Sequence, residues 1–417
     1  MYKKMIDILK AELVPALGCT EPIAIALASA KAREVLGEMP DELTVECSSN
    51  IIKNAKSVVV PMTKNLKGIE AAAIVGMIGG DANKKLEVLT TVTEKDLEET
   101  KRLLATGFCQ TKFLQTTEKL HIIVHMKKGE NSSLVELVKT HTGIARIEKD
   151  GVVIFEEEIE DCDVSTVDYS VLSVASILDF ANQVDIEEVR PILERQIEYN
   201  TRIAKEGLRN TYGVNVGSTL LDVYGDDVKI RAKAMPAAGS DARMNGCELP
   251  VIINSGSGNQ GMTVSLPVIE FGKMLDVEDE KILRALIISN LIAIYQKSEI
   301  GRLSAYCGAV SAAAGAGAGI TYLYGGNEEQ INQTIINTLA NVSGIVCDGA
   351  KSSCAAKIAS AVDAAIVATM ISLKGKGFLS GDGIVKDTIQ KTIDGVVTLA
   401  KEGMQETDEV IVKIMLN

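Results

Sequence analysis

The uncharged segment from Leu303 to Asn327 constrains the fold more than any other part of the sequence. The segment is long enough to span a bilayer. Its residues are mainly alanine, glycine and serine, however, and not the leucine, isoleucine and phenylalanine that drive membrane insertion. Aromatic residues make up only 4% of the whole chain, and tryptophan is absent. We therefore expect a buried helix here, within a core of closely packed helices that meet through small residues.

The chain has 417 residues, which is more than one hydrophobic core usually holds, so two domains are expected. With 43 Lys and Arg against 56 Asp and Glu, its net charge is −13. Such a surface repels nucleic-acid phosphates and anionic lipids, so we expect neither nucleic acid nor membrane as a partner. The N-terminal segment has charges at Lys10 and Glu12 and lacks the apolar stretch of a signal peptide. We expect a cytoplasmic protein.

Two kinds of sequence pattern alternate along the chain. Helical patterns cover residues 2–14 and 21–37 and nearly everything after about residue 165. The part between them mixes helix and strand patterns, and its clearest helix begins at the N-cap Thr93 and stops at Gly107. The expected strands are 43–47, 57–60, 86–93, 120–126 and the hairpin of 144–148 with 152–156.

These patterns predict an α+β fold. The first two helices resemble the helices that follow residue 165, so the mixed part reads as an insertion between them. We therefore expect a mostly α-helical catalytic domain formed by residues 1–38 and 165–417. Residues 39–164 are expected to form a smaller, inserted α+β domain that contributes polar loops facing the substrate.

Cys19 lies in the sequence Gly18-Cys19-Thr20-Glu21-Pro22, immediately before a predicted helix whose N-cap is Thr20. The positive end of a helix dipole and its free backbone N–H groups favour the thiolate form of a nearby cysteine. The negative charge of Glu21 opposes this effect. Cys19 is therefore either a reactive thiolate or a buried structural cysteine beside a helix cap.

The eight cysteines are too sparse and irregular for a disulfide framework. Three of them lie at predicted helix starts or turns: Cys307 before an Ala/Gly-rich helix, Cys347 before Asp348-Gly349, and Cys354 in the first turn of another helix. Three thiolates on flexible turn backbone can converge on one soft metal centre. The alternative is scattered core cysteines, which we expect of Cys47, Cys109, Cys162 and Cys247.

A glycine-rich loop, Asn254–Gly261, follows the apolar run Leu249–Ile253. Its backbone N–H groups, together with the side chains of Ser257 and Asn259, can cradle a carboxylate. An ordinary turn is the alternative. The glycines of Gly315–Gly319 do not mark a dinucleotide site, because no predicted strand precedes them and no βαβ unit surrounds them.

Two further polar segments are candidates for binding an amino-acid zwitterion, and a plain surface loop is the alternative for each. One is the turn Asp241–Gly246, whose Arg243 could instead cap the C-terminus of a neighbouring helix. The other leaves the first predicted strand and contributes Ser49, Asn50, Lys53 and Asn54. A buried site needs such groups, because the α-carboxylate of an amino acid must meet N–H donors or a cation.

Six motifs, in order over essentially the whole chain, resemble the iron–sulfur-dependent L-cysteine desulfidases: GCTEP, SSNIIKN, AGSDARMNG, NSGSGNQG, YCGAVSAAAGAGAG and CDGAKSSCAAK. They are more distantly similar to the α-chain of bacterial iron–sulfur L-serine dehydratases. The resemblance implies a [4Fe–4S] cluster, no pyridoxal phosphate, and breakdown of a β-substituted amino acid to pyruvate and ammonia. It places the cluster ligands on Cys307, Cys347 and Cys354, although the interval before Cys354 is shorter than in the dehydratase pattern.

The resemblance also implies a mechanism. Three cysteine ligands leave one iron with an open position, where it acts as a Lewis acid on the substrate. Cys19 is the candidate base for the α-proton, or alternatively a fourth ligand that closes the open position. L-Cysteine is the favoured substrate, giving pyruvate, ammonia and sulfide. L-Serine dehydration and a non-catalytic amino-acid-sensing iron–sulfur protein are the alternatives, and the alanine-rich helical surface favours a homodimer.

Overall fold

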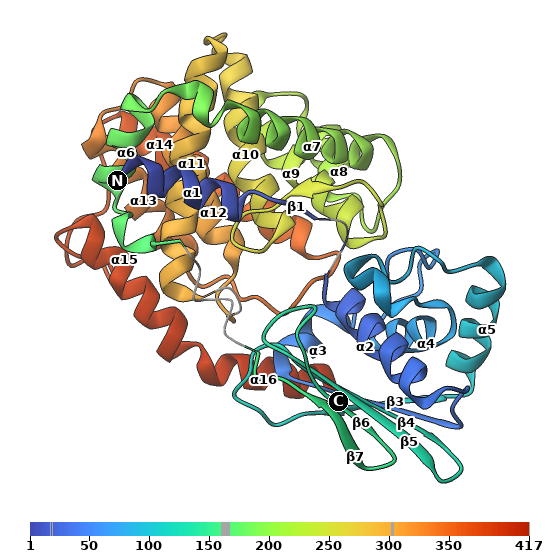
Figure 1. The fold of residues 1–417 in the computed structure, drawn as a ribbon. Helices are drawn as coiled ribbons and strands as arrows, with labels where there is room; N and C mark the ends of the chain where they lie inside the picture. The colour runs from blue at the N-terminus through green and yellow to red at the C-terminus, as the bar shows by residue number, and fades with distance from the viewer. Residues whose placement is uncertain (17, 19, 160–166, 302–303, 417) are drawn as a thin grey trace.

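The computed structural model describes residues 1–16, 18, 20–159, 167–301 and 304–416 (Figure 1). The fold belongs to the α+β class and is mostly helical, which confirms the predicted class. A short pair of strands joins β1 (Pro15–Ala16) to β8 (Val251–Ile252). The six-stranded sheet consists of β2 (Glu42–Cys47), β3 (Cys109–Phe113), β4 (His121–Lys128), β5 (Asn131–Val138), β6 (Ile144–Lys149) and β7 (Val152–Glu156).

The sheet has the strand order β3-β2-β4-β5-β6-β7, in which β2 and β3 are parallel and all other neighbours are antiparallel. Alternating apolar residues give it one buried face, formed in β4 by Ile122, Val124 and Met126. The helices of this part are α2 (Thr20–Leu36), α3 (Ser49–Ala55), α4 (Ile69–Gly79), the short η1 (Ala82–Glu87) and α5 (Glu94–Ala105). Helices α2 and α4 pack against the sheet and against each other. The two helices are so close that a Cβ on Gly76 of α4 would lie 2.3 Å from the Ala26 carbonyl oxygen of α2.

The rest of the chain is helical and surrounds one central helix, α12 (Gly308–Leu323). The prediction that this uncharged segment is a buried helix is confirmed, since almost every residue of α12 is buried. A Cβ on Gly315 would lie 2.3 Å from the carbonyl oxygen of Ser289 in α11, so the small residue allows the two helices to touch. The other elements are α1 (Tyr2–Glu12), η2 (Tyr169–Val171), α6 (Val174–Gln183), η3 (Ile186–Glu188), α7 (Arg190–Arg209), α8 (Val216–Tyr224), α9 (Val228–Met244), α10 (Gly258–Met274), α11 (Asp279–Ile300), α13 (Glu328–Val342), α14 (Cys354–Leu373), α15 (Ile389–Thr398), η4 (Leu399–Gly403) and α16 (Gln405–Leu416).

Among the described residues, α14 is the one helix long and apolar enough to cross a membrane by length and composition. More than half of that helix is buried inside the protein. It packs against α9, α12 and α13, and these contacts account for its apolar composition.

Two large clusters of buried apolar residues support the fold. One runs through α1 and most helices from α6 onward, and the other joins α2 and α4 to the sheet. The expected domain boundaries, between residues 38 and 39 and between residues 164 and 165, remain predictions. Because α2 packs with the sheet, we propose that the first boundary lies before Thr20. Helix α16 leaves the helical part and lies against α3, a helix of the part that contains the sheet (Figure 1).

Two predicted strands are wrong. Residues 57–60 form a single bridge, between Val59 and Lys67, and residues 86–93 fall in η1 and the turns after it. Both runs bury apolar side chains, such as Val60 and Leu89, without a neighbouring strand to pair with. The places beside β2 are taken by β3 and β4, and β3 and β5 were not among the expected strands.

Candidate active site

The predicted cluster cysteines lie where two loops of the helical part meet. An antiparallel bridge joins Tyr306 to Val346. Around it, the N–H of Cys307 donates to the carbonyl of Ile345 (3.1 Å), and the N–H of Cys347 donates to the carbonyl of Ala305 (2.6 Å). The bridge therefore brings together two cysteine-bearing segments that are far apart in the sequence.

Each thiol is held by a defined element. Cys307 is the N-cap of α12, and Cys354 is the first residue of α14 with its Sγ 3.5 Å from the Gly349 carbonyl oxygen. Burial, together with the nearby Cys347 and Cys354, raises the pKa of Cys307 to about 12. Burial also raises the pKa of Cys354, and Cys347 adds to that rise. The three thiols therefore act on one another electrostatically and share one environment.

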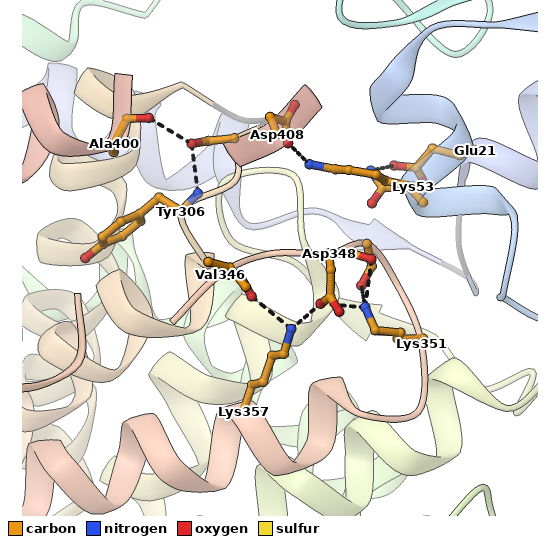
Figure 2. Close-up of polar contacts among 12 residues, drawn as sticks. Glu21, Lys53, Tyr306, Val346, Asp348, Lys351, Lys357, Ala400 and Asp408 are labelled. Carbon is orange, nitrogen blue, oxygen red and sulfur yellow. Dashed lines mark hydrogen bonds and ion pairs between the residues drawn. The ribbon is translucent and has the colours of Figure 1, made fainter. Parts of the chain in front are cut away.

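A charged clamp fixes the turn that follows Cys347. Figure 2 shows Asp348 between two lysines: Lys351, whose Nζ lies 2.5 Å from its carboxylate, and Lys357. The Lys357 ammonium also donates to the Val346 carbonyl (2.8 Å). Because Val346 belongs to the bridge and Lys357 to α14, this clamp links the turn to the helix that starts at Cys354. Burial alone would raise the pKa of the Asp348 carboxyl, but its pairing with the two lysines outweighs burial and lowers that pKa.

The donor set suits an iron–sulfur cluster in chemistry and number. Three soft thiols occupy helix starts and a turn and remain partly accessible, whereas Cys47, Cys109 and Cys247 are buried. Within the part of the chain that the structure describes, no three His, Cys, Asp or Glu side chains are already arranged to hold a metal ion. Cluster binding therefore requires the three side chains to turn toward one another, which their positions at helix starts and in a turn allow.

Two glycines bring other segments against this region. A Cβ on Gly308, next to Cys307, would lie 2.5 Å from the side chain of Gln260 in α10. Gly349 has φ of +94°, and a Cβ there would lie 1.8 Å from the Lys53 carbonyl oxygen. The first contact brings the start of α10 to the cysteines, and the second brings α3 to the turn after Cys347.

The first group of predicted substrate residues lies on α3, and its description as a loop is wrong. Ser48 is the N-cap, so the helix that follows presents Ser49, Asn50, Lys53 and Asn54. Asn50 is buried, and its Oδ1 has no hydrogen-bond partner among the described residues. The amide of Asn54 donates to Glu21 (3.1 Å), and the buried Lys53 pairs with Asp408 of α16 (Figure 2).

The second group lies around the N-terminus of α10. Ser257 is the N-cap of this helix, and its hydroxyl accepts from the Gln260 N–H. Arg243 belongs to the last turn of α9 and not to the predicted turn, which begins only after Met244. Its guanidinium donates to the Gly18 carbonyl (2.8 Å) and to Asn259 Oδ1 (3.5 Å). Arg243 therefore ties the start of α10 to the residue before Cys19, and Cys19 itself lies outside the described residues.

Sequence reasoning missed Lys297. This side chain lies near the end of α11 and is only 3% exposed. Burial lowers its pKa to about 8, while the nearby Cys347 and Cys307 oppose that fall. Its sequence context, Gln296-Lys297-Ser298-Glu299, is that of an ordinary polar helix end, so no local signal distinguishes this lysine from an exposed one.

Asp241, in the same helix as Arg243, is a buried carboxylate whose Oδ2 accepts from the Gly217 N–H (3.1 Å) while its Oδ1 has no partner among the described residues. Burial raises its pKa from 3.8 to about 6. Its ionisation therefore costs stability as the pH rises from about 4 to about 6, and this cost levels off at about 3 kcal/mol above that range. Asp241→Asn is expected to stabilise the protein by about 1–3 kcal/mol at pH 8 and much less at about pH 4, measured by denaturant unfolding. An equal effect at both pH values would contradict this account.

Comparison with known proteins places the chain in a family. The family model for the serine dehydratase alpha chain matches residues 83–413. A UPF0597 protein of Lachnoclostridium phytofermentans is 99% identical over 417 residues, covering 100% of both chains. UPF0597 proteins of Desulfitobacterium hafniense and Treponema denticola are 52% and 50% identical, covering 100% of this chain and 97% and 98% of theirs. The chain belongs to the serine dehydratase alpha-chain family.

Proposed function

We propose that this chain eliminates sulfide from L-cysteine, without pyridoxal phosphate, to give pyruvate, ammonia and sulfide. Membership of the serine dehydratase alpha-chain family implies a dehydratase-like lyase. The observation that carries the proposal is the Tyr306–Val346 bridge, which brings Cys307 and Cys347 together beside the start of α14. We propose that Cys307, Cys347 and Cys354 hold a [4Fe–4S] cluster.

When bound, such a cluster supplies a Lewis-acidic iron with an open position for the substrate's β-substituent. The chain's own residues supply the proton transfer. Cys19, immediately before α2, takes the α-proton as a thiolate, and the Cβ–S electron pair leaves with the sulfur as hydrosulfide. The remaining aminoacrylate takes up a proton and hydrolyses to pyruvate and ammonia. Arg243 holds the neighbouring Gly18 carbonyl and so positions the segment that carries Cys19.

Dehydration of L-serine by the same mechanism is the second candidate function, because the family is that of serine dehydratases. The two reactions differ only in the group that leaves Cβ. The affinity of sulfur for iron favours L-cysteine.

The decisive experiment compares both amino acids with anaerobically reconstituted protein. Equal amounts of sulfide and pyruvate from L-cysteine, at a higher kcat/KM than pyruvate from L-serine, support the proposal. The reverse preference supports the dehydratase. Binding of either amino acid without product identifies an amino-acid sensor. Hydroxylamine, which blocks pyridoxal phosphate, should leave the activity unchanged, and air should destroy it.

Asn50→Ala and Arg243→Ala test the proposed carboxylate contacts. Removing a charge-assisted contact costs about 1.5–3 kcal/mol, so each variant is expected to raise KM for L-cysteine by about 10- to 100-fold. The visible spectrum of the cluster should stay intact. Lys391→Ala, on an exposed surface of α15, is the matched control. A residue whose replacement leaves both KM and kcat at wild-type values is not an anchor.

A further inference from the structure

Lys297 is a buried cation without a partner in the described part of the chain. Its side chain is 3% exposed, and no hydrogen bond or ion pair joins it to any described residue. The titratable groups that act on it are Cys347, Cys307 and Lys119. An isolated charge in such a place is costly unless a counter-charge meets it. The structure thus holds an uncompensated positive charge beside the cysteines.

The other cations around the site already have partners. Lys53 pairs with Asp408, and both Lys351 and Lys357 pair with Asp348. Arg243 donates to a backbone carbonyl and to an asparagine. Lys297 differs from these four cations because its side chain has neither a hydrogen bond nor an ion pair to a described residue.

Lys119 is a second cation in this region, on the exposed surface. It comes from the segment before β4, in the part of the chain that contains the sheet, and its Nζ lies 3.0 Å from where a Cβ on Gly301 would be. Gly301 directly follows the end of α11, the helix that carries Lys297. Lys119 and Lys297 repel each other, because the charge on Lys119 lowers the pKa of Lys297. An anion that meets both would remove this repulsion.

We propose that Lys297 binds the α-carboxylate of the amino-acid substrate, and that Lys119 contributes the weaker second charge. This inference rests on the proposed function, which puts the substrate's sulfur at the cluster cysteines. Sulfur and the carboxyl carbon of cysteine are separated by only three bonds. The cation that takes the carboxylate must therefore lie near those cysteines, and Lys297 is a buried lysine on which Cys347 and Cys307 act electrostatically. Lys53, one of the candidates that the sequence offered for this role, pairs with Asp408.

The stability of the free protein gives a readout that separates this role from a structural one. Methionine has nearly the shape of a truncated lysine and no charge, so Lys297→Met removes an uncompensated buried charge. We expect it to raise the unfolding temperature of the ligand-free protein. A lysine that holds the fold together would give a lower unfolding temperature instead.

Binding is measured by calorimetry on the full-length, cluster-loaded protein with two probes, D-cysteine and cysteamine. Both carry a thiol and an amine, but only D-cysteine has a carboxylate. The α-hydrogen of D-cysteine faces away from the base, so it binds without turnover. Wild-type protein is expected to bind D-cysteine about 10- to 100-fold more tightly than cysteamine. Lys297→Met should abolish this preference, Lys297→Arg should retain part of it, and Lys391→Met, on the exposed face of α15, should retain all of it.

An unchanged preference in Lys297→Met overturns the proposal. A wild-type protein that shows no preference overturns it too, as does a fall in the unfolding temperature of Lys297→Met. The test is distinct from that of the reaction itself. If L-cysteine yields no pyruvate while the Lys297-dependent preference is present, the proposed reaction fails and the carboxylate site stands.

Discussion

Serine in place of Cys307, Cys347 or Cys354 is expected to remove most of the broad visible absorbance of anaerobically reconstituted protein. Serine is a poor ligand for iron because its oxygen is hard and stays protonated at neutral pH. Changing an outer-shell partner of a bound metal already costs about 10- to 100-fold in affinity or activity. Loss of a direct ligand should therefore lower kcat/KM for L-cysteine by about 100-fold or more, measured together with iron and acid-labile sulfide per chain.

Cys109→Ser is the matched control, since Cys109 is a buried cysteine in β3 of the sheet and lies outside the site. It should keep both the spectrum and the iron content. Full iron and sulfide occupancy in all three site variants would contradict the assignment of these cysteines as cluster ligands. If only two of the variants lose iron and sulfide, the third cysteine is not a ligand. Cys354 is the weakest of the three assignments, because the interval between Cys347 and Cys354 is shorter than in the dehydratase pattern.

Local patterns predicted much of the fold because they report local energetics. Thr93 accepts a hydrogen bond from the Asp96 N–H in a capping box, and α5 begins as the sequence indicates. The hairpin of β6 and β7 turns at Asp150 and Gly151, both with positive φ. Whether residues 57–60 and 86–93 form strands depends instead on which segments pair with β2. No local sequence pattern contains that information.

The same difference between local and long-range information applies to the residues of the candidate site. Positions of cysteines at helix starts can be read from the sequence, because caps and turns have composition signals. The bridge at Tyr306 and the pairing of Lys53 with Asp408 join segments separated by tens to hundreds of residues. Lys297 is the clearest case, because its burial depends on the elements packed around the end of α11 and not on its neighbours in sequence.

Cys19→Ser should behave in the opposite way to the cluster variants, keeping the spectrum and losing turnover. α2 begins at Thr20 and has Glu21 in its first turn, so residue 19 directly precedes the helix start as the sequence predicts. A serine hydroxyl there stays protonated, and it cannot remove the α-proton. General-base catalysis contributes about 10²- to 10⁴-fold, so kcat for L-cysteine should fall by that factor while KM changes little.

The spectrum decides between the two roles open to Cys19. Retained absorbance with lost turnover identifies the base, because a ligand cannot be removed without disturbing the cluster. Lost absorbance makes Cys19 a fourth ligand, and the open iron position that the proposed mechanism requires would then be closed in the resting protein. Retained absorbance with wild-type turnover would exclude both roles. A single variant, measured for iron content and for kcat, therefore separates a catalytic thiolate from a ligand and from a structural cysteine.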